Sequence, residues 1–236
     1  MLNRQALVFD LDDTLYPEAI YFASILAVFC SNHGWPNSSF AFLMDNFRHF
    51  RNSQSDLFSF FLDQNIDLWE NGSGAANCPF KESCHLELFE LYTSIQCRLK
   101  PHDGAATLMK SAHDSGLRVG VLTNGVPTAQ RNKWKCLDIP YKEDVIFVPA
   151  RECRREKPAP DSFHVLSQYL DVGLDRSIFI GDRYENDLLY PLSQGAVGIL
   201  LQEGGENICV HENCFHASDL ASVHLLIEKI INLGAL

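Results

Sequence analysis

The stretch from Leu7 to Glu18 reads LVFDLDDTLYPE, and it joins a short apolar run to three closely spaced carboxylates. Residues 7–9 are all apolar, which is typical of a strand that is covered on both faces in a parallel sheet. Asp10, Asp12 and Asp13 follow, and carboxylates this close repel one another unless a positive charge lies among them. The stretch therefore predicts either a solvated turn or a metal site at the end of a buried strand.

Apolar runs of strand length recur along the chain, and several are rich in Val or Ile: residues 6–9, 119–122, 145–148, 178–180 and 196–201. Helices are expected between and after them, over residues 104–115, 161–169, 184–194 and 219–231. Gly116 is a natural stop for the first of these helices, and Ser218 is the expected N-cap of the last. Strands that alternate with helices predict an α/β fold, a Rossmann-like parallel sheet flanked by helices.

Residues 17–96 interrupt this alternation, because they contain no comparable strand run. Phe and Leu recur there at helical spacings, and a polar loop rich in small residues lies at 71–77. We interpret this segment as an inserted α-helical domain whose aromatic residues form its own core. The α/β core domain is then expected to consist of residues 1–16 and 97–236.

The charge of the chain limits the classes of partner that it can bind. With 236 residues and a formal net charge of -11, the protein is not expected to bind a nucleic acid polymer or an anionic membrane. No stretch approaches the ~18 apolar residues of a membrane span, and no apolar leader precedes Leu7. These features predict a cytoplasmic protein without a membrane partner, and the sequence gives no indication of an oligomeric state.

The eight cysteines include two clusters in which Cys and His lie close together, at residues 78–85 and 209–216. Both clusters contain residue types that bind zinc, but neither has the close C-x2-C spacing of a zinc knuckle. We therefore favour incidental core and surface positions, with a structural zinc site as the alternative.

Polar side chains follow the expected strands at their carboxyl ends, namely Asp10 and Asp12, then Thr123 and Asn124, then Lys157, and finally Asp182 and Asp187. Ligands of a parallel sheet bind beyond these ends, so we expect the side chains to converge. Carboxylates for a hard cation, donors for anionic oxygens and a fixed positive charge suit phosphoryl transfer with Mg²⁺. One of the first two carboxylates can attack phosphorus while the other transfers a proton.

Four segments resemble the four motifs of the haloacid dehalogenase-like (HAD) hydrolase superfamily and occur in its order: DLDDT at 10–14, LTNG at 122–125, KPAPDSF at 157–163 and GDRYEND at 181–187. The resemblance implies a HAD-like α/β core. It also implies that an insertion directly after the first motif, here residues 17–96, is a helical cap of the C1 type that closes over the site.

The resemblance implies catalytic roles for three residues. Asp10 matches the nucleophile that becomes phosphorylated and binds Mg²⁺ with its other oxygen. Asp12 matches the general acid and base, and its backbone carbonyl would reach the metal. Lys157 matches the lysine that offsets negative charge on the nucleophile and on the phosphate.

The remaining motifs imply the binding of phosphate and metal. The implied ligands of the substrate phosphate are Thr123, Asn124 and Lys157. The implied ligands of Mg²⁺ are Asp10, Asp12, Asp182 and Asp187, of which the last would bind through water or orient the lysine.

The carboxylate at Asp12 favours a phosphatase over a dehalogenase, because an alkoxide leaving group needs a proton and a halide does not. We expect a Mg²⁺-dependent phosphatase that acts on a small phosphorylated metabolite, either a nucleoside monophosphate, as in 5′-nucleotidases, or a sugar phosphate. The alternatives are a phosphomutase, a haloacid dehalogenase-type hydrolase of the same fold, and a non-catalytic binding protein that kept the fold.

Overall fold

The chain forms two compact units in a computed structural model that describes residues 4–53, 56–65, 81–202 and 212–232. The first unit consists of Met1–Pro17 and Leu99–Leu236, and the second is the intervening segment Glu18–Arg98. The chain therefore leaves the first unit shortly after the DLDDT stretch and returns to it about 80 residues later.

The first unit is built on a parallel sheet of six strands in the order β3-β2-β1-β4-β5-β6. The strands are β1 (Ala6–Phe9), β2 (Arg118–Thr123), β3 (Ile146–Pro149), β4 (Ser177–Gly181), β5 (Val197–Leu201) and β6 (Cys214–Ala217). Strand β1 lies between β2 and β4, and Phe9 pairs with Val121 on one side and Ile180 on the other. The expected Rossmann-like α/β fold is confirmed, although β6 was not predicted.

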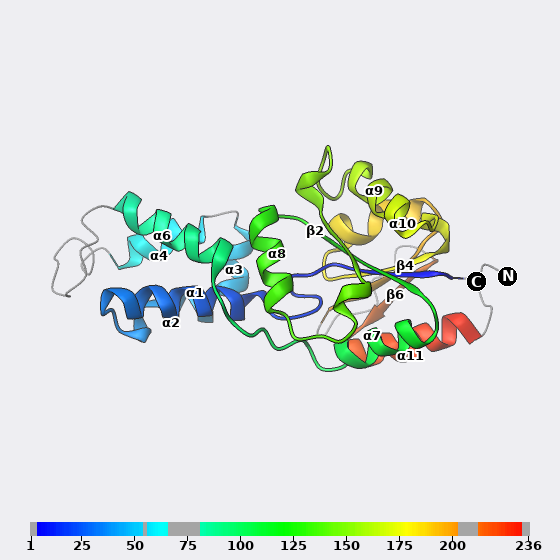
Figure 1. Cartoon of the computed structure of the whole chain (residues 1–236), viewed down its shortest axis with the longest axis horizontal. Coiled ribbons are helices and arrows are strands. Elements are labelled where there is room, and N and C mark those ends of the chain that lie inside the picture. Colours follow the sequence, from blue (N-terminus) through cyan, green and yellow to red (C-terminus); the bar gives the residue numbers. More distant parts are fainter. Residues whose placement is uncertain (1–3, 54–55, 66–80, 203–211, 233–236) are drawn as a thin grey trace. The chain divides into compact units, whose positions relative to one another are not determined.

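Helices cover both faces of this sheet, with α7 and α11 on one face and α9 and α10 on the other (Figure 1). The helices are α7 (Ala105–Asp114), α8 (Pro127–Cys136), α9 (Pro160–Leu170), α10 (Leu189–Ser193) and α11 (Leu220–Asn232). Short helical turns are η2 (Lys142–Asp144), η3 (Ala150–Glu152), η4 (Leu174–Arg176) and η5 (Tyr184–Leu188). Helix α8, directly after β2, was not predicted.

Strand β1 is buried on both faces, as its apolar sequence predicts. All four of its side chains are at most 2% exposed. Val8 belongs to a cluster with Phe163 and Leu166 of α9, while Leu7 and Phe9 alternate with it along the strand and point to the opposite face. Each such buried side chain contributes about 1.5–3 kcal/mol to folding, so the position of β1 in the centre of the sheet is strongly fixed.

Two of the expected helix boundaries differ from the structure. The helix expected at 184–194 is divided into the π-helical turn η5 and the short helix α10. The expected N-cap Ser218 is wrong, because the backbone N–H of Ser222 donates to Asp219 Oδ1 at 2.7 Å. Asp and Ser are both good N-caps, and the choice between neighbouring candidates depends on how the chain leaves β6.

The described part of the second unit is helical, with no strand in residues 18–53, 56–65 or 81–98. Its helices are α1 (Glu18–His33), η1 (Asn37–Phe40), α2 (Ala41–Asp45), α3 (Phe47–Asn52), α4 (Leu57–Gln64) and α6 (Lys81–Ser94). Phe22 packs against Phe47, Phe58 and Tyr92 with ring centroids 5.3–5.7 Å apart. These aromatics form a core for the unit, while the loop expected at 71–77 lies outside the described residues.

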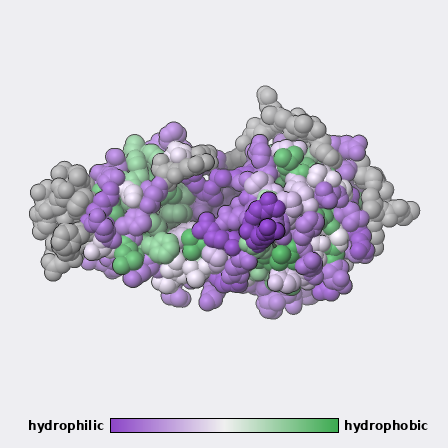
Figure 2. Space-filling view, turned by 90° about the horizontal axis from the view of Figure 1, so that it is seen from above, coloured by the Kyte–Doolittle hydropathy of each residue, from purple (hydrophilic) through white to green (hydrophobic). Residues whose placement is uncertain are grey.

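Within the described ranges, no helix combines the length and the apolar character that a membrane span needs. On the face of the molecule shown in Figure 2, hydrophobic residues are scattered among hydrophilic ones.

Candidate active site

The predicted site residues lie at the carboxyl ends of three adjacent strands. Asp10 directly follows β1, Thr123 is the last residue of β2, and Asp182 directly follows β4. The strand order reverses direction at β1, which has β2 on one side and β4 on the other. Ligands of open parallel sheets bind at such a switch point, so the topology alone places these side chains where a substrate is expected.

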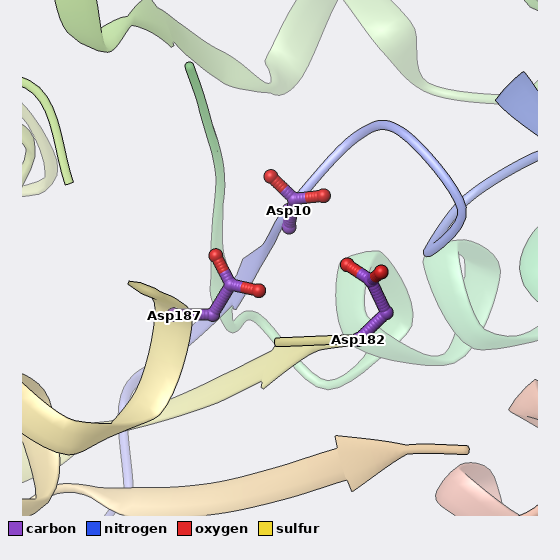
Figure 3. A group of neighbouring side chains, drawn as sticks. All are labelled: Asp10, Asp182 and Asp187. Carbon is purple, nitrogen blue, oxygen red and sulfur yellow. The ribbon is translucent and has the colours of Figure 1, made fainter. Parts of the chain in front are cut away.

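Three carboxylates meet at this point (Figure 3). The side chains of Asp10, Asp182 and Asp187 each present an oxygen, and these oxygens lie within 4.8 Å of one another. They come from the end of β1, the end of β4 and the turn η5. We call these three residues the acidic trio. Its oxygen donors are of the type that Mg²⁺ prefers, so the side chains fit a hard divalent cation.

Lys157 supplies a positive charge to the acidic trio. Its ammonium group donates to Asp10 Oδ1 at 2.6 Å and to Asp187 Oδ1 at 2.7 Å, and the lysine is only 6% exposed. Three carboxylates against one ammonium leave a formal excess of two negative charges in a buried place. A divalent cation would offset that excess, which is a physical reason for expecting one here.

The ionisation of Asp10 reflects this crowding. Burial raises the pKa of Asp10 to about 8; the Lys157 ammonium opposes the rise, and the carboxylates of Asp187 and Asp182 add to it. Burial by itself would lower the pKa of Lys157, but the carboxylates of Asp10 and Asp187 raise it instead. The ammonium is therefore charged at neutral pH, whereas Asp10 takes up a proton below pH about 8 unless a cation offsets the crowded negative charge.

The local backbone explains why Asp187 reaches the trio. Its Oδ2 accepts a hydrogen bond from the backbone N–H of Arg183 at 3.0 Å, which folds the side chain back over the turn. A side chain at Gly181 would place its Cβ 2.5 Å from Asp187 Oδ2, closer than real contacts allow. The glycine that ends β4 thus leaves the space that the Asp187 carboxylate occupies.

Asp12 lies in different surroundings from Asp10. Tyr16 donates its hydroxyl to Asp12 Oδ1 at 2.6 Å, Gln130 donates to Oδ2 at 2.7 Å, and Lys133 lies 2.9 and 3.0 Å from the two oxygens. Burial by itself would raise the pKa of Asp12, but the Lys133 ammonium and these hydrogen bonds hold it below the usual value. Its carboxylate is not a member of the acidic trio, and the metal role expected for its backbone carbonyl stays a prediction.

Thr123 and Asn124 contact protein groups of the site. The Thr123 hydroxyl oxygen accepts from Gln130 at 2.6 Å. The Asn124 side chain holds the backbone of Lys157, with its Nδ2 donating to Lys157 O at 2.8 Å and its Oδ1 accepting from Lys157 N at 3.0 Å. Asn124 therefore fixes the loop that carries the lysine. The phosphate contacts expected of Thr123 and Asn124 stay predictions.

Two groups result from the predicted residues. Asp10, Lys157, Asp182 and Asp187 form one of them, and Asp12 and Thr123 are joined in the other through Gln130. Sequence reasoning missed Gln130 and Lys133 because it missed α8. A signal was present, because Pro127 suits the first turn of a helix directly after the LTNG motif.

The two Cys/His clusters gain no support as metal sites within the described part of the chain. Cys78 and Cys209 lie outside the described residues. Cys84 and Cys214 are buried in α6 and β6, respectively. Among the described residues, the acidic trio is the group of His, Cys, Asp and Glu side chains that could hold a metal ion.

Comparison with solved structures shows similar folds at low sequence identity. The defluorinating L-2-haloacid dehalogenase Rha0230 matches with a TM-score of 0.64 and 15% identity, over 96% of each chain. YfnB of Bacillus subtilis, described as a HAD-hydrolase bound to magnesium, matches with a TM-score of 0.63 and 16% identity, over 95% of this chain and 99% of YfnB. A HAD phosphatase from Thermococcus onnurineus matches with a TM-score of 0.57 and 16% identity, over 94% and 97% of the two chains.

These likenesses establish the fold and leave the reaction open, since dehalogenases and a phosphatase are both among them. None of the curated proteins compared with the chain matches it. The family model described as haloacid dehalogenase-like hydrolase matches residues 5–189, which include all four motifs. The chain therefore belongs to the haloacid dehalogenase-like hydrolases.

Proposed function

We propose that this protein is a Mg²⁺-dependent phosphatase that hydrolyses a small phosphomonoester through an aspartyl-phosphate intermediate. The observation that carries the proposal is the carboxylate of Asp12, which shares the Gln130 amide with Thr123 at the edge of the sheet where Asp10 lies. A proton carrier in that place serves a leaving group that must be protonated.

In the first step, an oxygen of Asp10 attacks phosphorus, and the bond from phosphorus to the leaving oxygen breaks. Asp12, which is ionised before substrate binds, takes the proton of the substrate's phosphate monoanion and passes it to that oxygen, and the Lys157 ammonium offsets charge on the nucleophile and the phosphate. When bound at the acidic trio, Mg²⁺ supplies positive charge against the phosphate oxygens. Asn124 keeps Lys157 in place through both of its backbone hydrogen bonds.

In the second step, a water oxygen attacks phosphorus and the bond to Asp10 breaks. Asp12 takes the proton of that water, as a base. Tyr16, Gln130 and Lys133 all donate to the Asp12 carboxylate and so stabilise its ionised form, which is the form that this step requires.

The helical unit Glu18–Arg98 is the cap in this proposal. A cap that closes over the site excludes water from the first step and supplies contacts that select the substrate. We propose a nucleoside monophosphate or a sugar phosphate of the cytoplasm as the substrate class.

A haloacid dehalogenase is the second candidate, because two of the similar structures carry that activity in their names. Asp10 would then attack the carbon that bears the halogen, and halide would leave without a proton. That reaction gives the Asp12 carboxylate no leaving group to protonate, so the presence of a carboxylate at this position favours phosphate chemistry. A phosphomutase would use the same residues and differ in its acceptor.

The test measures phosphate release from 4-nitrophenyl phosphate and chloride release from 2-chloropropionate, each with Mg²⁺ and with a chelator. We expect phosphate release that needs Mg²⁺, and a loss of about 10⁴-fold or more in Asp10→Asn, because the nucleophile is removed. Asp13→Asn is the matched control: Asp13 has a left-handed backbone with φ of 60°, which Asn tolerates, and its activity should persist.

Chloride release without phosphate release would overturn the proposal in favour of the dehalogenase. Phosphate release that survives in Asp10→Asn would overturn the mechanism. A panel of nucleoside monophosphates and sugar phosphates then identifies the substrate class, and transfer of the phosphate to a second hydroxyl of the product would indicate a mutase.

A further inference from the structure

Helix α8 has a polar face that is buried in the first unit. Gln130 is 1% exposed and Lys133 is 0% exposed, and they lie three residues apart, so they share one face of the helix. Lysine is almost never fully buried unless it is paired, because removing its charge from water is costly. The burial of these two polar residues is explained by their contacts with other polar groups.

Lys133 contacts both oxygens of the Asp12 carboxylate. Its ammonium nitrogen lies 3.0 Å from Oδ1 and 2.9 Å from Oδ2, so it straddles the group. The Tyr16 hydroxyl adds a third hydrogen bond, to Oδ1 at 2.6 Å. With both oxygens bonded to donors on different elements, the plane of the Asp12 carboxylate has one orientation.

Gln130 connects Asp12 with the end of β2. Its Nε2 lies 2.7 Å from Asp12 Oδ2, 2.6 Å from Thr123 Oγ1 and 2.7 Å from the backbone oxygen of Asn124. Carboxylate and carbonyl oxygens only accept hydrogen bonds, so the amide nitrogen has to face them. The Thr123 hydroxyl accepts from this amide and donates its own hydrogen to Asn124 O at 3.3 Å.

We propose that Lys133 is a positioning residue, which sets the orientation of the Asp12 carboxylate beside Thr123, and that Gln130 is the link between the two. This inference rests on the proposed phosphatase activity. Neither residue touches the substrate in this account, and both act through Asp12. The simpler alternative is a buried ion pair that only stabilises the fold.

The two interpretations differ in how a Lys133→Met variant treats leaving groups of different basicity. Nitrophenolate leaves from 4-nitrophenyl phosphate with little need of a proton, whereas the phenolate of phenyl phosphate needs one. If Lys133 positions Asp12, the variant loses about 10²-fold in the first-turnover rate on saturating phenyl phosphate. Its first turnover of 4-nitrophenyl phosphate stays within about threefold of the wild type, because that step needs little acid catalysis.

The second half of the reaction gives an independent readout. Asp12 is the base that activates water, so the variant should accumulate the phosphorylated enzyme and show a burst of one nitrophenolate per active site. Lys135→Met is the matched control, because the same substitution falls on the exposed face of the same helix. It should leave both substrates and the burst unchanged.

Equal losses in the first-turnover rate on both substrates, or no loss of that rate on either, would overturn the inference in a wild type that is active. A wild type that releases phosphate from neither substrate would instead overturn the proposed function, so the two failures are distinguishable. Should Lys133→Met unfold, Gln130→Met provides the test, since it removes one contact to Asp12 and leaves the ion pair. It should show the same preference for the better leaving group, and a uniform loss in it counts against the inference.

Discussion

Asp10 and Asp12 are two residues apart, yet their carboxylates lie in surroundings of opposite charge balance. Asp10 has two further carboxylates and one ammonium around it, so its neighbourhood carries an excess of negative charge. Asp12 has one ammonium and two neutral donors, so its charge is fully matched. The surroundings of Asp10 are suited to binding a cation, whereas the charge of Asp12 is already balanced without one.

The turn after β1 explains how neighbouring residues come to differ so much. Strand β1 ends at Phe9, and the backbone N–H of Leu15 then donates to Leu11 O at 3.0 Å. Asp13 has the positive φ of a left-handed residue, and its N–H donates to Tyr16 O at 2.9 Å. An extended chain would direct the two aspartates to one face, whereas this turn gives each its own set of partners. Two carboxylates can thereby lie two residues apart in sequence and still be independent in charge.

The largest effect is expected from breaking the balanced pair. Asp12→Asn removes the carboxylate whose oxygens lie 2.9 and 3.0 Å from the buried Lys133 ammonium, which should cost about 3–5 kcal/mol in the free energy of unfolding. Urea denaturation of the chelator-treated protein measures this cost. Asp182→Asn is the matched control, because it removes a charge from a group with too many of one sign and should leave metal-free stability unchanged or higher.

The double variant Asp12→Asn with Lys133→Met sharpens the same comparison. Removing both partners leaves no buried unpaired charge, so the double variant should be more stable than either single one. Additive losses in the double variant would mean that the two residues contribute independently, and the charge balance described for Asp12 would be wrong.

Much of the core fold and of the acidic trio could be predicted from the sequence. Apolar runs such as residues 6–9 report burial on both faces, and parallel strands have to bring their carboxyl ends together. Asp10 and Asp182 follow such runs directly and Lys157 lies in the loop after β3, so their convergence required only the sheet topology.

The partners of Asp12 could not be predicted, because Gln130 and Lys133 are polar residues that are usually exposed but are buried here. Helix α8 buries Gln130 and Lys133 beside Trp134, so its inward face lacks the apolar stripe by which an amphipathic helix is recognised. Strand β6 was missed for a related reason, since its sequence CFHA is short and contains a histidine. Tertiary contacts determine that α8 and β6 form, and the local sequence pattern does not predict either of them.

The next effect concerns pH and Mg²⁺. In a chelator, the pKa of Asp10, about 8, lies above its ordinary value of 3.8, so its contribution to stability is full below pH ~4 and is lost as pH rises through 8. The pKa of Asp12 lies below its ordinary value, so its contribution is present above pH ~4 and is lost as pH falls further. Mg²⁺ at 100 times its Kd should add about 2.7 kcal/mol to the free energy of unfolding.

Unfolding curves between pH ~5 and ~8.5, with and without Mg²⁺, measure this difference. The gain from Mg²⁺ should grow with pH, because bound carboxylates must be deprotonated, and it should disappear in Asp182→Asn. A gain that is the same at every pH, or that survives in Asp182→Asn, would contradict the assignment of the acidic trio as the metal site.

A smaller effect is expected where the backbone makes room for the trio. In Gly181→Ala the new Cβ would lie 2.5 Å from Cβ and Oδ2 of Asp187, so that side chain has to move. We expect a loss of about 2 kcal/mol in stability from overpacking and a weaker response to Mg²⁺ in thermal unfolding. Gly120→Ala is the control, because its Cβ would crowd the buried side chains of Leu166 and Leu170 at 3.1–3.2 Å and contact no member of the trio. An unchanged response to Mg²⁺ in Gly181→Ala would show that Asp187 is not needed for the metal.

The smallest effect tests the neutral donors around Asp12. Tyr16→Phe removes the hydroxyl that lies 2.6 Å from Asp12 Oδ1 and keeps the buried ring. Because Lys133 and Gln130 remain on the carboxylate, the loss should be about 1.5 kcal/mol, the lower end for a hydrogen bond to a charged group. Urea denaturation measures this loss, and Tyr190→Phe, whose hydroxyl contacts the exposed His164, is the control. A loss as large as that of Asp12→Asn would mean that Tyr16, and not the ammonium of Lys133, stabilises the charge of Asp12.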